Sequence, residues 1–127
     1  MDKQVIETPD APSSPLYSQG VRVGSTIYVS GMTGMDAATK QMAGATIHEQ
    51  TRQALANCMA VVETGGGRLE HVAQVTVLLA NPADFAGMNE EYAKVFVKSP
   101  PTRAVAKLGV DLPNVLVSIM MTAHVES

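Results

Sequence analysis

The first strand-like segments, rich in apolar residues, are residues 21–23 and 26–30. They flank Gly24-Ser25, a two-residue turn of the kind that joins the strands of a β-hairpin. Residues 8–15 contain three prolines, which exclude a helix and predict an ordered loop. Residues 31–44 contain three glycines and three methionines, and we interpret them as a second loop.

A helical period begins near residue 46 and ends near residue 64. Mostly apolar residues recur there at spacings of three or four, as one face of a helix requires. They are Ile47, Thr51, Leu55, Cys58 and Val62. The glycines at 65–67 predict the end of this helix, because glycine adopts left-handed backbone conformations at no steric cost.

A strand and a second helix follow. Residues 71–80 enclose the nearly continuous apolar run 75–79, which predicts a strand buried on both faces. Asn81-Pro82 then predicts a helix start, with asparagine as the cap and proline at the first helical position. The stripe expected on this helix is Phe85, Met88, Asn89, Tyr92 and Phe96.

The last part of the chain predicts two more strands. The prolines at 100–101 end the second helix, and residues 102–108 and 115–125 have the pattern of strands, separated by a turn at 112–114. The predicted order is ββ, α, β, α, ββ. A chain of 127 residues fits one core, so we expect a single α+β domain over residues 1–127.

The number of predicted helices indicates that the chain forms an oligomer. Two helices cover one face of such a sheet, yet residues 75–79 and 115–121 are apolar at nearly every position. Only 17% of the residues are charged, which is low for a fully solvated surface. We therefore expect another copy of the chain to cover the second face of the sheet.

Charge and composition argue against some classes of binding partner. The formal net charge is −3 and no block of Lys and Arg occurs, which argues against nucleic acid. The first residues lack the apolar core of a signal peptide, and no apolar run reaches membrane-spanning length. One cysteine, Cys58, cannot form an intrachain disulfide. These features favour a soluble protein of the reducing cytoplasm, with no membrane partner.

Most motifs of catalysis and cofactor binding are absent from the sequence. There is no phosphate-binding loop or dinucleotide fingerprint, because the glycines at 65–67 follow a helix rather than a strand. His48, His71 and His124 lack metal-ligand spacing, so no metal site is predicted. Cys58 lies on the apolar face of its helix and is interpreted as a buried thiol.

Arg103 is the main candidate for a functional residue. It lies among small and apolar residues in a predicted strand, and a guanidinium keeps its charge, so it must meet an anion. Two interpretations stay open: an ion pair with Asp or Glu in the oligomer, or a bidentate contact with a substrate carboxylate. Asn89, an amide on an apolar stripe, is interpreted first as bonding to nearby backbone.

Four segments occur in the order and spacing of one known family: residues 17–20 (Tyr-Ser-Gln-Gly), 27–31 (Ile-Tyr-Val-Ser-Gly), 89–92 (Asn-Glu-Glu-Tyr) and 101–104 (Pro-Thr-Arg-Ala). Over essentially its whole length the chain resembles the Rid (reactive intermediate deaminase) proteins, also called YjgF-like or L-PSP endoribonuclease-like proteins. The resemblance implies a chorismate mutase-like sheet with two helices on one face. It also implies a homotrimer with active sites in clefts between subunits.

The resemblance further implies an activity. Typical members hydrolyse reactive enamines and imines, released from amino acids by pyridoxal-phosphate enzymes, to keto acids and ammonia, without a metal or cofactor. In this comparison Arg103 holds the substrate carboxylate together with the backbone N–H of Val105. The other implied binding residues are Tyr17, Ser30, Gly31, Asn89 and Pro113.

One position departs from the family pattern. Where deaminating members carry a glutamate that activates water, this chain has Ser118. Serine is a poor base near neutral pH, and losing a general base typically costs ~10²–10⁴ in rate. The first hypothesis is a deaminase in which Arg103 and Ser118 are the catalytic residues. The alternative is a non-catalytic trimer that binds keto acids. An endoribonuclease or translation inhibitor ranks last because of the acidic balance.

Overall fold

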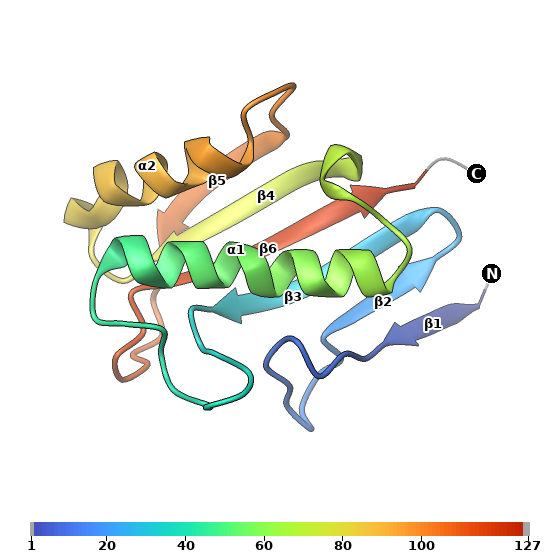
Figure 1. Cartoon of the computed structure of the whole chain (residues 1–127), viewed down its shortest axis with the longest axis horizontal. Coiled ribbons are helices and arrows are strands. Elements are labelled where there is room, and N and C mark those ends of the chain that lie inside the picture. Colours follow the sequence, from blue (N-terminus) through green and yellow to red (C-terminus); the bar gives the residue numbers. More distant parts are fainter. Residues whose placement is uncertain (1, 126–127) are drawn as a thin grey trace.

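The computed structural model describes residues 2–125. The elements in chain order are β1 (Lys3–Ile6), β2 (Gly20–Val23), β3 (Thr26–Thr33), α1 (Ile47–Thr64), η1 (Leu69–His71), β4 (Val72–Leu79), η2 (Pro82–Asp84), α2 (Phe85–Val95), β5 (Thr102–Lys107) and β6 (Val117–His124). Figure 1 shows α1 and α2 side by side on one face of the sheet. This confirms the predicted α+β class with two helices on one face.

The six strands form one mixed sheet in the order β1-β2-β3-β6-β4-β5. Neighbouring strands are antiparallel except β4 and β5, which are parallel because the chain returns through α2 between them. β1 and β5 are therefore the two edges of the sheet. Arg103 lies in β5, on a strand with one neighbour and one free edge.

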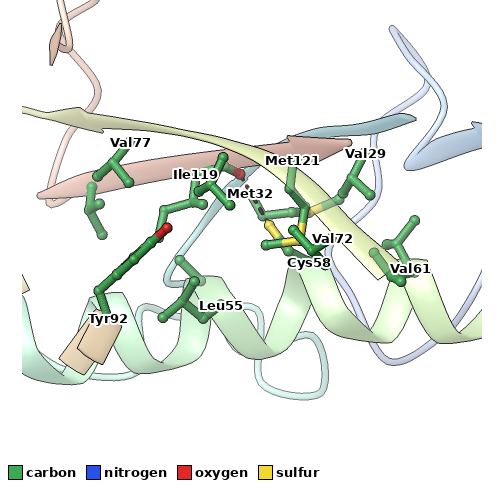
Figure 2. Close-up of a cluster of buried hydrophobic side chains, with 14 of the residues drawn as sticks. Val29, Met32, Leu55, Cys58, Val61, Val72, Val77, Tyr92, Ile119 and Met121 are labelled. Carbon is green, nitrogen blue, oxygen red and sulfur yellow. Dashed lines mark hydrogen bonds between the residues drawn. The ribbon is translucent and has the colours of Figure 1, made fainter. Parts of the chain in front are cut away.

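The core lies between the helices and the sheet. Thr46 and Glu49 form a capping box that starts α1, and the predicted apolar face of α1 is buried. In Figure 2, Leu55, Cys58 and Val61 point from α1 towards the side chains of β3, β4 and β6. Among residues 2–125, no helix is long and apolar enough to cross a membrane.

Three local predictions from the sequence are confirmed. Gly24 has a φ of 59°, as the hairpin turn between β2 and β3 requires. The Asn81 side chain accepts a hydrogen bond from the N–H of Ala83 and so caps η2, which leads into α2. Of the glycines after α1, Gly66 alone adopts a positive φ, 98°.

Two segments differ from their predictions. β1 was not predicted, and it pairs with β2 as an edge strand whose first three residues are exposed. Residues 31–33 belong to β3 rather than to the predicted loop. Met32 pairs with Ile119 and Thr33 with Ser118, after a bulge that follows Val29.

Within the single chain β4 is fully buried on one face only. Val75, Val77 and Leu79 are buried under the helices, whereas Thr76 and Leu78 are only half-buried on the opposite face. In Figure 1 both helices lie on the near side of the sheet. The apolar run therefore faces an open surface on one side, and its cover by another copy stays a prediction.

Candidate functional site

Arg103 is held by three side chains of α2. It pairs in register with Val75, a fully buried residue, so its side chain points to the helix side of β5. Its Nη1 donates a hydrogen bond of 2.7 Å to Oδ1 of Asn89. The guanidinium carbon lies 4.8 Å from the ring centroid of Tyr92 and 5.8 Å from that of Phe85. This amide and two rings orient the cation without neutralising it.

Arg103 forms no ion pair within the described residues, and the interpretation of an ion pair with another copy of the chain stays open. Among residues 2–125, no carboxylate oxygen lies within 4.0 Å of its guanidinium nitrogens. Arg103 is exposed, so its remaining N–H donors are open to a ligand. The prediction that Asn89 bonds to backbone is wrong, since its carbonyl oxygen accepts from Arg103.

Tyr92 contributes a ring and no proton chemistry. Its side chain is buried, and its hydroxyl has no hydrogen-bond partner among the described residues. Burial raises the pKa of Tyr92, and the charge of Arg103 opposes that rise. Tyr92 also packs on Phe96, with ring centroids 4.7 Å apart. In Figure 2 its hydroxyl points into the core rather than towards solvent.

Val105 offers its backbone at the free edge of β5. The N–H of Leu108 donates to the carbonyl of Leu79 in β4 at 2.8 Å. Backbone groups alternate between the two edges of a strand, so the N–H groups of Arg103, Val105 and Lys107 point away from β4. A pocket of about 420 Å³ adjoins this stretch. Its lining residues are Leu79, Pro82, Phe85, Val105, Ala106 and Lys107.

Ser118 and Gly31 form a second group, on the open face of the sheet. Ser118 pairs with Leu78, and the next residue, Ile119, is fully buried under the helices. A Cβ built on Gly31 would lie 3.0 Å from Oγ of Ser118, so the two residues are neighbours on this face. Ser118 and Arg103 thus lie on opposite faces of the sheet. The structure does not bring this predicted catalytic pair together within one chain.

Ser30 holds the amino-terminal loop that carries Tyr17. Its hydroxyl donates to the carbonyl of Ser18 at 2.6 Å, and its N–H donates to the carbonyl of Gln19 at 2.9 Å. The amide of Gln19 is buried and bonds to the backbone of Thr8, Ala11 and Pro12. Tyr17 itself is 52% exposed. The hydroxyl proton of Ser30 is thus used in the bond to Ser18, and the hydroxyl oxygen can still accept a hydrogen bond.

Pro113 lies apart from both groups. It is exposed and lines a different pocket, beside the buried amide of Gln50. Gln50 donates to the carbonyls of Gly44 and Asn114 and accepts from the N–H of Leu116. Sequence reasoning missed this buried amide, although a glutamine next to the apolar face of a helix is a detectable signal.

The described residues contain no group of three His, Cys, Asp or Glu side chains that could hold a metal ion. His48 Nε2 lies 2.9 Å from Oε2 of Glu90, on the outer side of the helices. Cys58 is fully buried, as predicted, and its Sγ donates to the carbonyl of Ile119. Burial raises the pKa of this thiol far above its usual range, which leaves it without nucleophilic character.

Comparisons with known proteins identify the family. The profile of the family described as Endoribonuclease L-PSP, the YjgF/RidA family, matches residues 8–125, and the chain belongs to this family. A RutC family protein of Pyrococcus horikoshii is 37% identical over 126 residues, which are 98% of this chain and 99% of that one.

Two further relatives carry functional names. A 2-iminobutanoate/2-iminopropanoate deaminase of Dermatophagoides farinae is 36% identical over 114 residues, and the match covers 88% of each chain. The solved structure of E. coli TdcF with bound serine matches with a TM-score of 0.91 and 29% identity, covering 97% of this chain and 99% of that one. The resemblance inferred from the sequence is confirmed at the level of family and fold.

Proposed function

We propose that this protein hydrolyses small 2-imino acids, and the enamines in equilibrium with them, to 2-keto acids and ammonia. The observation that carries the proposal is the setting of Arg103. It is an exposed cation, oriented by Asn89 and two aromatic rings, with no carboxylate partner in residues 2–125. The deaminase name of one relative and the serine bound to another support a small carboxylate as the ligand.

The reaction needs binding and one molecule of water. Arg103 holds the substrate carboxylate through parallel N–H bonds, and the outward N–H of Val105 donates to the same ligand. Water adds to the imine carbon, a proton passes to nitrogen, and the C–N bond then breaks. The hydroxyl proton leaves as the C=O bond forms, so the products are the keto acid and ammonia. Ser118 can orient the water by hydrogen bonding, but its hydroxyl is too weak a base to activate it fully.

The two groups of site residues are proposed to meet between copies of the chain in a homotrimer. Arg103, Asn89 and Val105 lie at one edge of the sheet, whereas Gly31 and Ser118 lie on its open face. The open face also exposes Tyr28 by 49% and Met120 by 46%, so it carries apolar area that a neighbour can cover. In this arrangement β5 of one copy lies against Gly31 and Ser118 of the next, with Tyr17 beside the entrance.

The direct test is an assay of imine hydrolysis. 2-Iminobutanoate is generated in situ and its loss is followed in wild type, Arg103→Ala and Arg68→Ala. Arg68 is an exposed arginine that pairs with Glu70 outside the proposed site, so it is the matched control. We expect kcat/KM to fall by about 10²-fold or more in Arg103→Ala, because a bidentate charged contact is lost, and to stay unchanged in the control. Equal rates in all three proteins would refute the assignment.

Ser118 favours one further candidate function, a trimer that binds keto acids without turnover. This candidate predicts Arg103-dependent binding of 2-oxobutanoate, no hydrolysis by wild type, and a gain of hydrolysis in Ser118→Glu. Hydrolysis by wild type would exclude it. Ribonuclease activity is not proposed, because the net charge is −3 and the basic residues do not cluster along the chain.

A further inference from the structure

The side chains of Lys107 and Arg103 lie on the same face of β5, which is an edge strand of the sheet. The two residues are four positions apart in the strand, so their side chains lie on the same side of the sheet, about 13 Å apart at Cα. Val105 lies between them, and its backbone N–H points to the same free edge. The strand thus presents one cation on each side of the backbone N–H of Val105.

A pocket lies beside these residues. It has a volume of about 420 Å³ and is lined mainly by apolar groups, together with Lys107. Arg103 does not line the pocket, but Phe85 does, and its ring centroid lies 5.8 Å from the guanidinium carbon of Arg103. A ligand held by Arg103 can therefore extend along β5 towards Lys107.

The charge at the pocket is positive. No acidic residue lines it, and among the described residues no carboxylate lies within 4.0 Å of the Lys107 ammonium. Asp84 is on the adjoining turn η2 but is not part of the wall. A cation that lines a mainly apolar pocket attracts an anionic group on any ligand that reaches it.

We infer that the preferred substrate carries a second anionic group, and that Lys107 binds it. The substrate class is then the 2-imino dicarboxylic acids, the imines of acidic amino acids. Arg103 takes the carboxylate next to the imine carbon, and Lys107 takes the distal one. This inference rests on the proposed function, because the imine chemistry is taken from it.

The test compares substrates within each protein. kcat/KM is measured for 2-iminoglutarate and for 2-iminopropanoate, both generated in situ, and their ratio is taken. Wild type is compared with Lys107→Met, which keeps the apolar stem and removes the charge, and with Lys107→Arg, which keeps the charge. Lys98→Met is the matched control, since Lys98 is exposed in the loop after α2.

The ratio should favour the dicarboxylate in wild type and fall by a factor of roughly 5 to 30 in Lys107→Met, mainly through KM. Lys107→Arg and Lys98→Met should keep the wild-type ratio, and added salt should lower it. A ratio near one in wild type, or one that Lys107→Met leaves unchanged, would overturn the inference while the deaminase survives.

Failure of the proposed function gives a different result. If wild type hydrolyses neither imine, the deaminase is refuted, and binding then decides the role of Lys107. Titration calorimetry with 2-oxoglutarate and 2-oxobutanoate should still show a preference for the dicarboxylate that Lys107→Met abolishes. Equal affinities for the two keto acids in wild type would refute the second anion site.

Discussion

The carbonyl oxygen of Asn89 accepts a 2.7 Å hydrogen bond from Nη1 of Arg103, across the gap between α2 and β5. A neutral acceptor fixes the guanidinium in place and leaves its charge uncompensated. A carboxylate at the same position would satisfy the charge and compete with any anionic ligand. Because residue 89 is an amide and not a carboxylate, Arg103 keeps a charge that can bind an anionic ligand.

Asn89→Asp should therefore weaken ligand binding. The added carboxylate would neutralise Arg103, and we expect the Kd for 2-oxobutanoate, measured by calorimetry, to rise by about 10-fold or more. Asn81→Asp is the matched control, because Asn81 caps η2 and aspartate is an equally good cap. Binding by Asn89→Asp as tight as that of wild type would show that the charge of Arg103 is not used.

Glu91 of α2 has a side chain that is 4% exposed and forms ion pairs with Lys94 in the same helix and with Arg52 of α1. The hydrogen bond from Lys94 holds the pKa of Glu91 below its ordinary value, with help from Arg52 and against the effect of burial. Because the folded-state pKa is lowered, the stability from this carboxylate is present above the unfolded pKa and is lost as pH falls through the folded one.

Glu91→Gln should accordingly lower Tm relative to wild type. The difference should be complete above about pH 5 and should shrink as pH falls below about 4. Thermal unfolding of both proteins over a pH range that extends above about 5 and below about 4 measures it. Glu63→Gln, on the exposed side of α1, should show no such difference. A Glu91→Gln deficit that grows towards low pH would contradict the assignment of the shift.

Tyr92→Phe should leave the fold intact or stabilise it. The hydroxyl of Tyr92 is buried without a partner among residues 2–125, and an unsatisfied buried hydroxyl costs about 1–3 kcal/mol. We expect the free energy of unfolding in urea to stay unchanged or to rise by about 1 kcal/mol, with ligand affinity retained because the ring remains under Arg103. A clear loss of stability would reveal a bond that this hydroxyl makes in solution.

A site shared between copies predicts complementation. Arg103→Ala removes one group, and Gly31→Val places a side chain against Ser118 in the other. If both variants keep the Tm of wild type and are inactive alone, trimers assembled from an equal mixture should regain activity at about a quarter of the sites. Co-purification of differently tagged copies verifies the mixing. Mixed trimers as inactive as the parent variants would place the whole site in one chain.

Much of the fold could be predicted from the sequence because its signals are local. The helical stripe of α1, the Gly24-Ser25 turn and the Asn81 cap each depend on neighbours within a few residues. β1 escaped prediction because it is a short edge strand, and three of its four residues are exposed. Residues 31–33 suggest a loop in isolation, and only their pairing with β6 makes them a strand.

Arg103 and Asn89 could be singled out from the sequence, but their contact could not. Arg103 stands out because a permanent charge lies among small apolar residues, and Asn89 because it interrupts an apolar stripe. Their contact joins two elements, and no local pattern reveals it. The separation of Arg103 from Ser118 depends on the register of β5 and β6 with β4. Phe85 was expected on the buried stripe, yet it is 46% exposed beside Arg103.

The most direct measurement of the central claim is kcat/KM for 2-iminobutanoate in Arg103→Lys relative to wild type. Lysine keeps the charge but lacks the planar fork that binds a carboxylate through two parallel bonds. We predict a fall of at least about 10-fold, with 2-oxobutanoate bound correspondingly more weakly. Wild-type activity in Arg103→Lys, together with full activity in Arg103→Ala, would contradict the account.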